Sequence, residues 1–187
     1  MYIPDNPLLA KPMFIRKDEM DWKLYFPGTD IPLEFKRKMS MGTCAFGHTE
    51  PDPECYCGIY GYSSFYLIPE KFWGSDSIVF VTLQICNVAL FNKGIIRAQE
   101  VYKWAVVDDS PWWPKTRERG LILNELASAN KMHYFSMRHA SRELTESCRQ
   151  HFLEDTTVFV NRATAPWLKI GESYASGKRE GQGSQSS

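Results

Sequence analysis

The chain has 187 residues, of which 43% are hydrophobic and 14% aromatic, and its 22 basic side chains balance 22 acidic ones. This composition is typical of a folded protein with one buried core and differs from that of an intrinsically disordered chain. A formal net charge of zero excludes a global field that would attract nucleic acid or an anionic membrane. Any such partner would need a local patch.

Five cysteines, an odd number, are spread along the chain: Cys44, Cys55, Cys57, Cys86 and Cys148. The first 22 residues contain three prolines and lack the continuous apolar stretch of a secretory signal. No run approaches the roughly 18 apolar residues of a membrane span. We therefore expect a reduced, cytoplasmic (intracellular) protein with no disulfide framework and no membrane partner.

Prolines recur through the first 40 residues, at positions 4, 7, 12, 27 and 32, and interrupt any regular element. We therefore predict an irregular N-terminal arm over residues 1–40, laid over a single α+β domain of residues 41–172. Residues 173–187 are rich in Gly, Ser and Gln and have no apolar face. This composition predicts a disordered tail.

The clearest β pattern lies in residues 58–107, for which we predict an antiparallel sheet that is either open or curled into a barrel or roll. Within it, Gly61 predicts a bulge or a close backbone approach. The turn residues Asn92-Lys93-Gly94 predict a hairpin. The predicted strand regions are Gly58–Tyr66, Ile78–Leu90, Ile95–Arg97 and Tyr102–Val107.

Beyond residue 114 the hydrophobic period changes to that of helices, which we predict over about 116–130 and 137–152. In the second helix, apolar residues recur at three- and four-residue steps: Met137, Ala140, Leu144, Cys148 and Phe152. Thr156–Val160 is a further candidate strand that could close the sheet.

Cys44, His48, Cys55 and Cys57 lie within fourteen residues, in the order Cys-x3-His-x6-Cys-x-Cys. Thiolate and imidazole are the ligands that structural zinc prefers, so these four residues are candidate metal ligands. The single residue between Cys55 and Cys57 is shorter than the usual zinc spacing. The alternative is that the cysteines are small packed or partly exposed side chains and that His48 bonds to backbone. Both interpretations remain open at this point.

A cysteine nucleophile, Cys55 or Cys57 with His48 as its base, is the catalytic alternative. No oxyanion hole or third orienting group accompanies it, and a redox dithiol normally has two intervening residues. Phosphate-binding loops, dinucleotide fingerprints, His-Glu-x-x-His helices and nucleophile elbows are also missing from the sequence. We therefore predict no catalytic residue and no small-molecule substrate.

The chain also resembles a known group of proteins in the order of its motifs. A Pro27-Gly28 turn precedes His48, then a proline, then Cys55-x-Cys57-Gly58-Ile59-Tyr60, and a β run ends in Gly94-x-x-Arg97-Ala98. This pattern is similar to that of uncharacterised actinobacterial and phage proteins with the hallmark Cys-x-Cys-Gly-Ile-Tyr-Ala. The resemblance covers roughly residues 25–107, with Gly61 in place of the alanine. It implies a shared β-rich unit and points to His48, Cys55 and Cys57, without implying an activity.

Residues 115–151 contain seven basic side chains against four acidic ones, next to a tryptophan pair. An aromatic and basic surface can stack bases and hold phosphates, and it equally suits a protein partner. The alternative is a solvated helix face beside tryptophans packed in the core. The candidate residues for this surface are Trp112, Trp113, Lys115, Arg117, Arg138 and Arg142.

The function that we predict is that of a non-catalytic, intracellular binding or accessory module for a protein partner. Its Cys/His loop would stabilise the fold either by packing or by binding zinc. The first alternative is a nucleic-acid-binding regulator that uses the Trp/Arg surface, and the second is a cysteine-dependent enzyme.

Overall fold

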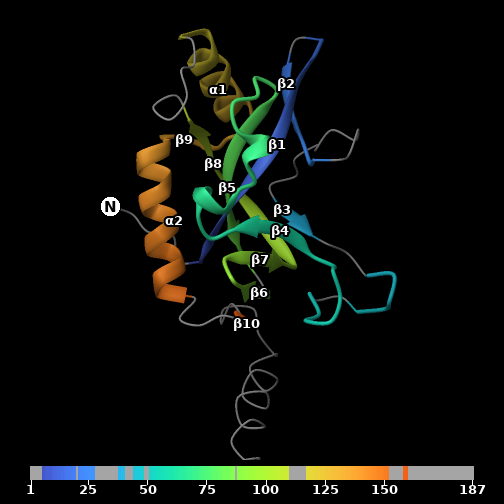
Figure 1. The fold of residues 1–187 in the computed structure, drawn as a ribbon. Coiled ribbons are helices and arrows are strands. Elements are labelled where there is room, and N and C mark those ends of the chain that lie inside the picture. The colour runs from blue at the N-terminus through green and yellow to red at the C-terminus, as the bar shows by residue number, and fades with distance from the viewer. Residues whose placement is uncertain are drawn as a thin grey trace, which may run out of the picture.

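The computed structural model describes residues 6–19, 21–27, 38–40, 44–48, 51–86, 88–109, 117–151 and 158–159. These residues form one mixed sheet, two α-helices and two short 3-10 turns, Phe65–Leu67 and Glu70–Phe72 (Figure 1). The helices are α1 (Arg117–Ala129) and α2 (Met137–His151). The strands are β1 (Leu8–Asp18), β2 (Asp21–Tyr25), β3 (Lys38–Ser40), β4 (Ile59–Tyr62), β5 (Ile78–Ile85), β6 (Ala89–Asn92), β7 (Ile95–Ala98), β8 (Glu100–Asp108), β9 (His133–Ser136) and β10 (Val158–Phe159).

The strand order is β10-β6-β7-β4-β1-β5-β8-β3, with β2 paired to β1 and β9 paired to β8. Every pair is antiparallel except β8 with β9. The predicted α+β class with an antiparallel-dominated sheet is confirmed. The outermost strands of the path, β10 and β3, do not pair with each other among the described residues, so the sheet is open there and the barrel alternative is wrong.

The prediction of an irregular arm over residues 1–40 is wrong for β1, β2 and β3. β1 lies inside the sheet, between β4 and β5, although it contains Pro12. The Ile15 N–H donates to Ser77 O, toward the β5 side, and alternation along the strand turns the Pro12 nitrogen the other way. On that side the pairing partner changes from β4, opposite Ala10, to β2, opposite Phe14. Proline is tolerated there because no N–H is needed.

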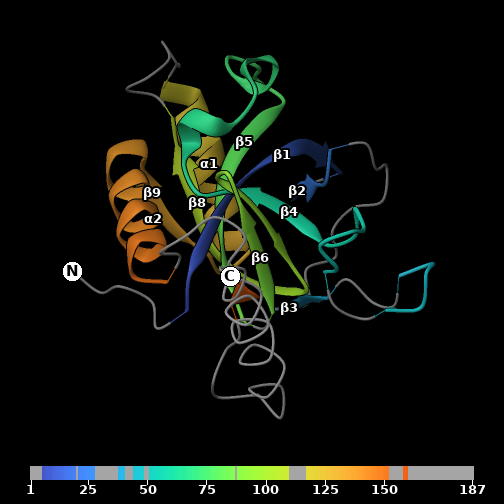
Figure 2. The same ribbon diagram turned by 60° about the horizontal axis from the view of Figure 1, so that its bottom comes forward.

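The core lies between the sheet and the helices. Its fully buried side chains come mainly from β1, β5, β8, α1 and α2, for example Leu9, Leu83, Val106, Leu123 and Leu144. α2 lies along the left side of the molecule in Figures 1 and 2, and the segment around residues 44–57 projects on the right. The Cys/His segment is therefore held at the side of the molecule away from α2.

Most of the later elements agree with the sequence predictions. Both helices form within a residue or two of the predicted bounds, and β6 and β7 form a hairpin whose turn is Lys93-Gly94, both with positive φ. β10 pairs with β6 in the region predicted for a last strand. The strand predicted over Gly58–Tyr66 is shorter, Ile59–Tyr62. The strand predicted over Ile78–Leu90 is divided into β5, which ends at Ile85, and β6, which begins at Ala89. The predicted tail, residues 173–187, lies outside the described residues.

Neither α1 nor α2 combines the length and the apolar character that crossing a membrane would require, and these are the helices among the described residues.

Candidate metal centre

A tight loop carries the first two candidate ligands, Cys44 and His48. The Gly47 N–H donates to Cys44 O, and the Cys44 N–H donates to His48 O, both at 2.8 Å. Gly47 has φ +89°, a conformation that other residues adopt only at a cost. The loop thus reverses the chain so that both side chains face one point.

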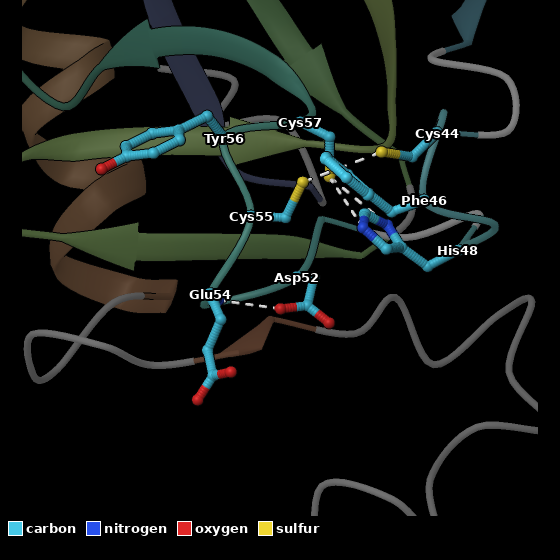
Figure 3. Close-up of a pocket in the computed structure, with 8 residues that line it drawn as sticks. All are labelled: Cys44, Phe46, His48, Asp52, Glu54, Cys55, Tyr56 and Cys57. Carbon is cyan, nitrogen blue, oxygen red and sulfur yellow. Dashed lines mark hydrogen bonds between the residues drawn. The ribbon is translucent and has the colours of Figure 1, made fainter.

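The second pair, Cys55 and Cys57, follows a turn at Asp52. Asp52 O accepts from the Cys55 N–H at 3.1 Å, and Asp52 Oδ1 accepts from the Glu54 N–H at 2.8 Å. In extended backbone, side chains two residues apart point to the same side. Figure 3 shows Cys55 and Cys57 directed toward the cluster, while Tyr56 points away and is 92% exposed. A spacing of one residue therefore does not prevent the two thiols from sharing an ion.

The four ligand atoms lie within 4.8 Å of one another. Cys44 Sγ and Cys55 Sγ are 3.7 Å apart, and Cys57 Sγ and His48 Nδ1 are 3.4 Å apart. Tetrahedral zinc with ordinary bond lengths would separate two sulfurs by about 3.8 Å, and a sulfur and a nitrogen by about 3.6 Å. These two distances are thus close to those of a tetrahedral site, and the other pairs lie within 4.8 Å.

Backbone hydrogen bonds reach the sulfur atoms. Desolvation raises the pKa of Cys55, but hydrogen bonds from the Cys57 N–H and from the neighbouring thiols and imidazole outweigh it and lower this pKa to about 7. Desolvation raises the pKa of Cys57, the Asp52 N–H opposes the rise, and the negative charges of Cys55 and Cys44 add to it. One cysteine of the cluster is therefore readily deprotonated, and a bound cation would be needed to keep several cysteines deprotonated at the same time.

Arg97 of β7 fastens the Cys55–Cys57 segment to the sheet. Its guanidinium donates to Cys55 O, and to Cys57 O and Pro53 O at 3.5 Å each. The Tyr60 hydroxyl donates to Tyr56 O at 2.8 Å. In the sequence, Arg97 stands out only as part of the motif order that carries the resemblance. Its link to the cluster follows from the β4–β7 register, which sets Arg97 opposite Tyr60.

Gly58 connects the cluster to β4 with φ +118°, and a Cβ at this position would lie 3.2 Å from Arg97 Cβ. A glycine here therefore lets the ligand segment pass close to the arginine that holds it.

An open hollow of about 670 Å³ surrounds the cluster, and Phe46, Asp52, Glu54 and Tyr56 line it together with the four ligands. Phe46 is 83% exposed. All four positions of a tetrahedral ion would be filled by protein atoms, which is the arrangement of structural zinc sites, whereas catalytic sites keep a position open.

The residues predicted for a Trp/Arg surface are only partly described. Arg117 is exposed on α1, and Arg138 and Arg142 are exposed one turn apart on α2. Trp112, Trp113 and Lys115 lie outside the described residues, so this surface stays a prediction. Among the described residues, burial leaves the local basic excess unchanged, because one side chain of each sign is buried: Arg119, which pairs with Asp109 at 3.5 Å, and Glu143.

Comparison of the chain with models of known protein families, with curated proteins and with solved structures finds no match.

Proposed function

We propose that Cys44, His48, Cys55 and Cys57 bind one structural Zn²⁺, and that the resulting metal loop (residues 44–48 and 51–57) is the docking surface of a non-catalytic module for a protein partner. The observation that carries the proposal is the convergence of three sulfurs and one imidazole nitrogen within 4.8 Å. Thiol binding of zinc requires reduced cysteines, which agrees with the intracellular location that we propose from the cysteine count.

A metal would supply the stability that packing does not give to this loop. Pro51 is the single buried residue among the described residues of the metal loop. None of these residues belongs to the hydrophobic core. Thiol hydrogen bonds are weak and do not offset the conformational entropy of ordering a dozen residues. Zinc binding contributes directly to folding in such segments.

A nucleophilic role for the cluster is less well supported. The pKa of Cys55 is lowered to about 7, as a nucleophile requires, but His48 lies nearest to Cys57, whose pKa is raised. The four side chains also face one another, and a nucleophile has to face a substrate.

The surface of the metal loop fits a protein partner better than nucleic acid. Phe46 and Tyr56 are the most exposed large hydrophobic side chains among the described residues, and exposed aromatic side chains are frequent interface anchors. Asp52 and Glu54 line the hollow with them. Carboxylates repel phosphates and attract basic side chains, so the expected partner surface is apolar with basic groups at its edge.

Metal analysis of the purified chain tests the zinc site. Protein expressed with zinc available and purified without chelators is expected to contain about one zinc per chain, and Cys55→Ser or Cys57→Ser is expected to remove most of it. Cys86→Ser is the matched control, since Cys86 lies outside the cluster and contacts Glu100. A folded wild-type chain without metal would refute the proposal.

The docking role needs a separate test. Phe46→Ser and Tyr56→Ser change exposed side chains and are expected to leave the zinc content unchanged. A partner retained by the wild-type chain and lost by these variants supports docking at the metal loop. A partner retained equally by the wild-type chain and by the variants would show that the docking surface lies elsewhere.

A further inference from the structure

A second hollow, of about 410 Å³, lies beside β4 and shares none of the four candidate zinc ligands. Its walls are mostly apolar and include four aromatic side chains from different elements: Phe26 after β2, Tyr60 and Tyr62 on β4, and Phe72 in a 3-10 turn. Its volume is within the range of about 300–1,000 Å³ that is typical of small-molecule sites. The residues that line it include one charged group, Lys11 of β1.

The Lys11 ammonium has a donor to spare. Its Nζ donates to Tyr60 O at 2.6 Å and lies 5.0 Å from the centre of the Phe26 ring. An ammonium group has three donors, and no carboxylate is among the residues that line the hollow. Desolvation lowers the pKa of Lys11 to about 8, and the side chain is half-buried in the fold.

An anion brought into this hollow would compensate the desolvated charge. One ammonium matches a single negative charge, whereas a phosphate dianion would need a second cationic group, and Lys11 is the one charged residue among those that line the hollow. The aromatic walls in turn favour a flat ring. The hollow therefore favours a ligand with a single negative charge and a flat ring, and one small molecule can have both.

We propose that this hollow binds a small aromatic carboxylate, with its ring against the aromatic walls and its carboxylate on the Lys11 ammonium. This is a binding site separate from the metal centre. Loss of zinc and loss of ligand binding can therefore be observed independently.

Three probe compounds separate the two parts of the recognition. Phenylacetate has the ring and the charge, phenylacetamide has the ring alone, and acetate has the charge alone. Titration of the full chain, followed by backbone amide shifts of Ile59, Tyr60 and Tyr62, is expected to show saturable binding of phenylacetate. Phenylacetamide is expected to bind roughly tenfold or more weakly, since it lacks the charge-assisted hydrogen bond, and acetate more weakly still.

Lys11→Met keeps most of the length of the unbranched side chain and removes the charge, so it is expected to abolish the preference for the acid over the amide. Lys17→Met, an exposed position on the same strand, is the matched control and is expected to keep the preference. Equal affinity of the wild-type chain for acid and amide, or no binding of phenylacetate at millimolar concentration, would overturn the proposal even if Lys11→Met did not fold. A preference that survives in folded Lys11→Met would overturn it as well.

The pH dependence gives a further readout. Lys11 is charged below a pKa of about 8, so phenylacetate affinity is expected to fall as the pH rises from 7 to 9, while phenylacetamide affinity stays constant. The other titratable groups that line the hollow are Tyr60 and Tyr62, and burial raises the pKa of Tyr62, which keeps it neutral. Val81 on β5, Phe26 and Phe72 face Lys11 from the remaining elements and do not titrate. A constant phenylacetate affinity over this range would contradict the role of Lys11.

Discussion

Gly61 of β4 leaves the space into which β1 packs. A Cβ on Gly61 would lie 2.3 Å from Leu9 Cδ1 and 2.9 Å from Ala10 O, and the second of these atoms is backbone that cannot turn away. The close backbone approach predicted from the sequence is thus confirmed. The resemblance itself stays a prediction.

Gly61→Ala is expected to destabilise the fold by about 1–3 kcal/mol, because the added methyl group overpacks the β1–β4 contact. Gly120→Ala in α1 is the matched control, and it is expected to stabilise the fold. A Cβ there meets only Tyr134 Oη, at 3.8 Å, and alanine in a helix is favoured over glycine by about 0.5–1 kcal/mol. Urea unfolding of the two variants measures both changes. Equal stability of Gly61→Ala and wild type would mean that β1 shifts freely.

Arg97 acts on the metal loop through backbone carbonyls, without contributing a ligand. Arg97→Lys keeps the positive charge but cannot reach several carbonyls with one planar group. Groups that orient metal ligands typically account for a 10–100-fold change in affinity, and we expect a loss of about that size. Competition with a chromophoric zinc chelator measures it, with Arg142→Lys on the exposed face of α2 as the control. An unchanged zinc affinity would show that the loop orders itself without the arginine.

Side chains of α2, the second described helix, hold the beginning of β1. The Leu8 N–H donates to Ser147 Oγ at 2.8 Å in a fully buried position, and Cys148 Sγ lies 3.8 Å from Leu8 O. Burial raises the pKa of Cys148 to about 12, so this thiol stays neutral. The beginning of β1 thus depends on side chains about 140 positions later in the chain.

Ser147→Ala is expected to destabilise the fold by about 1–3 kcal/mol, because it leaves the buried Leu8 N–H without its acceptor. Thr145→Ala, two residues earlier on the exposed face of α2, is expected to change stability by no more than about 0.5 kcal/mol. Chemical denaturation of both variants provides the comparison. Equal effects would mean that another group replaces the hydroxyl.

The elements that could be predicted are those whose pattern is local. The apolar run of β5, the Lys93-Gly94 turn and the stripe of Met137, Ala140 and Leu144 on α2 each reflect the geometry of one element. β1 could not be recognised, because the tolerance of Pro12 depends on which strands flank it. β9 was missed because its four residues obtain their hydrogen bonds from β8, about 28 positions earlier.

The same distinction applies to the sites. Four metal-ligand side chains within fourteen residues are visible in the sequence, and the structure brings all four together. Arg97 reaches Cys55 over 42 positions, and Lys11 reaches Tyr60 over 49. These contacts arise only from strand pairing, so the arginine's role and the aromatic hollow could not be derived from spacing.

For the whole molecule, the core and the metal loop are separate sources of stability. The core cluster joins β1, β5, β8, α1 and α2 and includes none of the described residues between 44 and 57. A core of this size can fold without a metal. The loop instead depends on its turns, on Arg97 and, as we propose, on zinc.

Removal of zinc with a chelator under reducing conditions is therefore expected to loosen the metal loop and leave the sheet intact. Amide hydrogen exchange measures this for each segment. Amides that hydrogen-bond within the loop, those of Cys44, Gly47 and Cys55, are expected to exchange at least about tenfold faster, because local opening no longer requires release of the metal. Amides of β5 and β8 are expected to keep their rates. Cys57→Ser should show fast loop exchange without chelator and no response to it. Faster exchange in β5 and β8 as well would mean that the metal supports the whole fold, and an unchanged loop would show that the loop is ordered by its protein contacts alone.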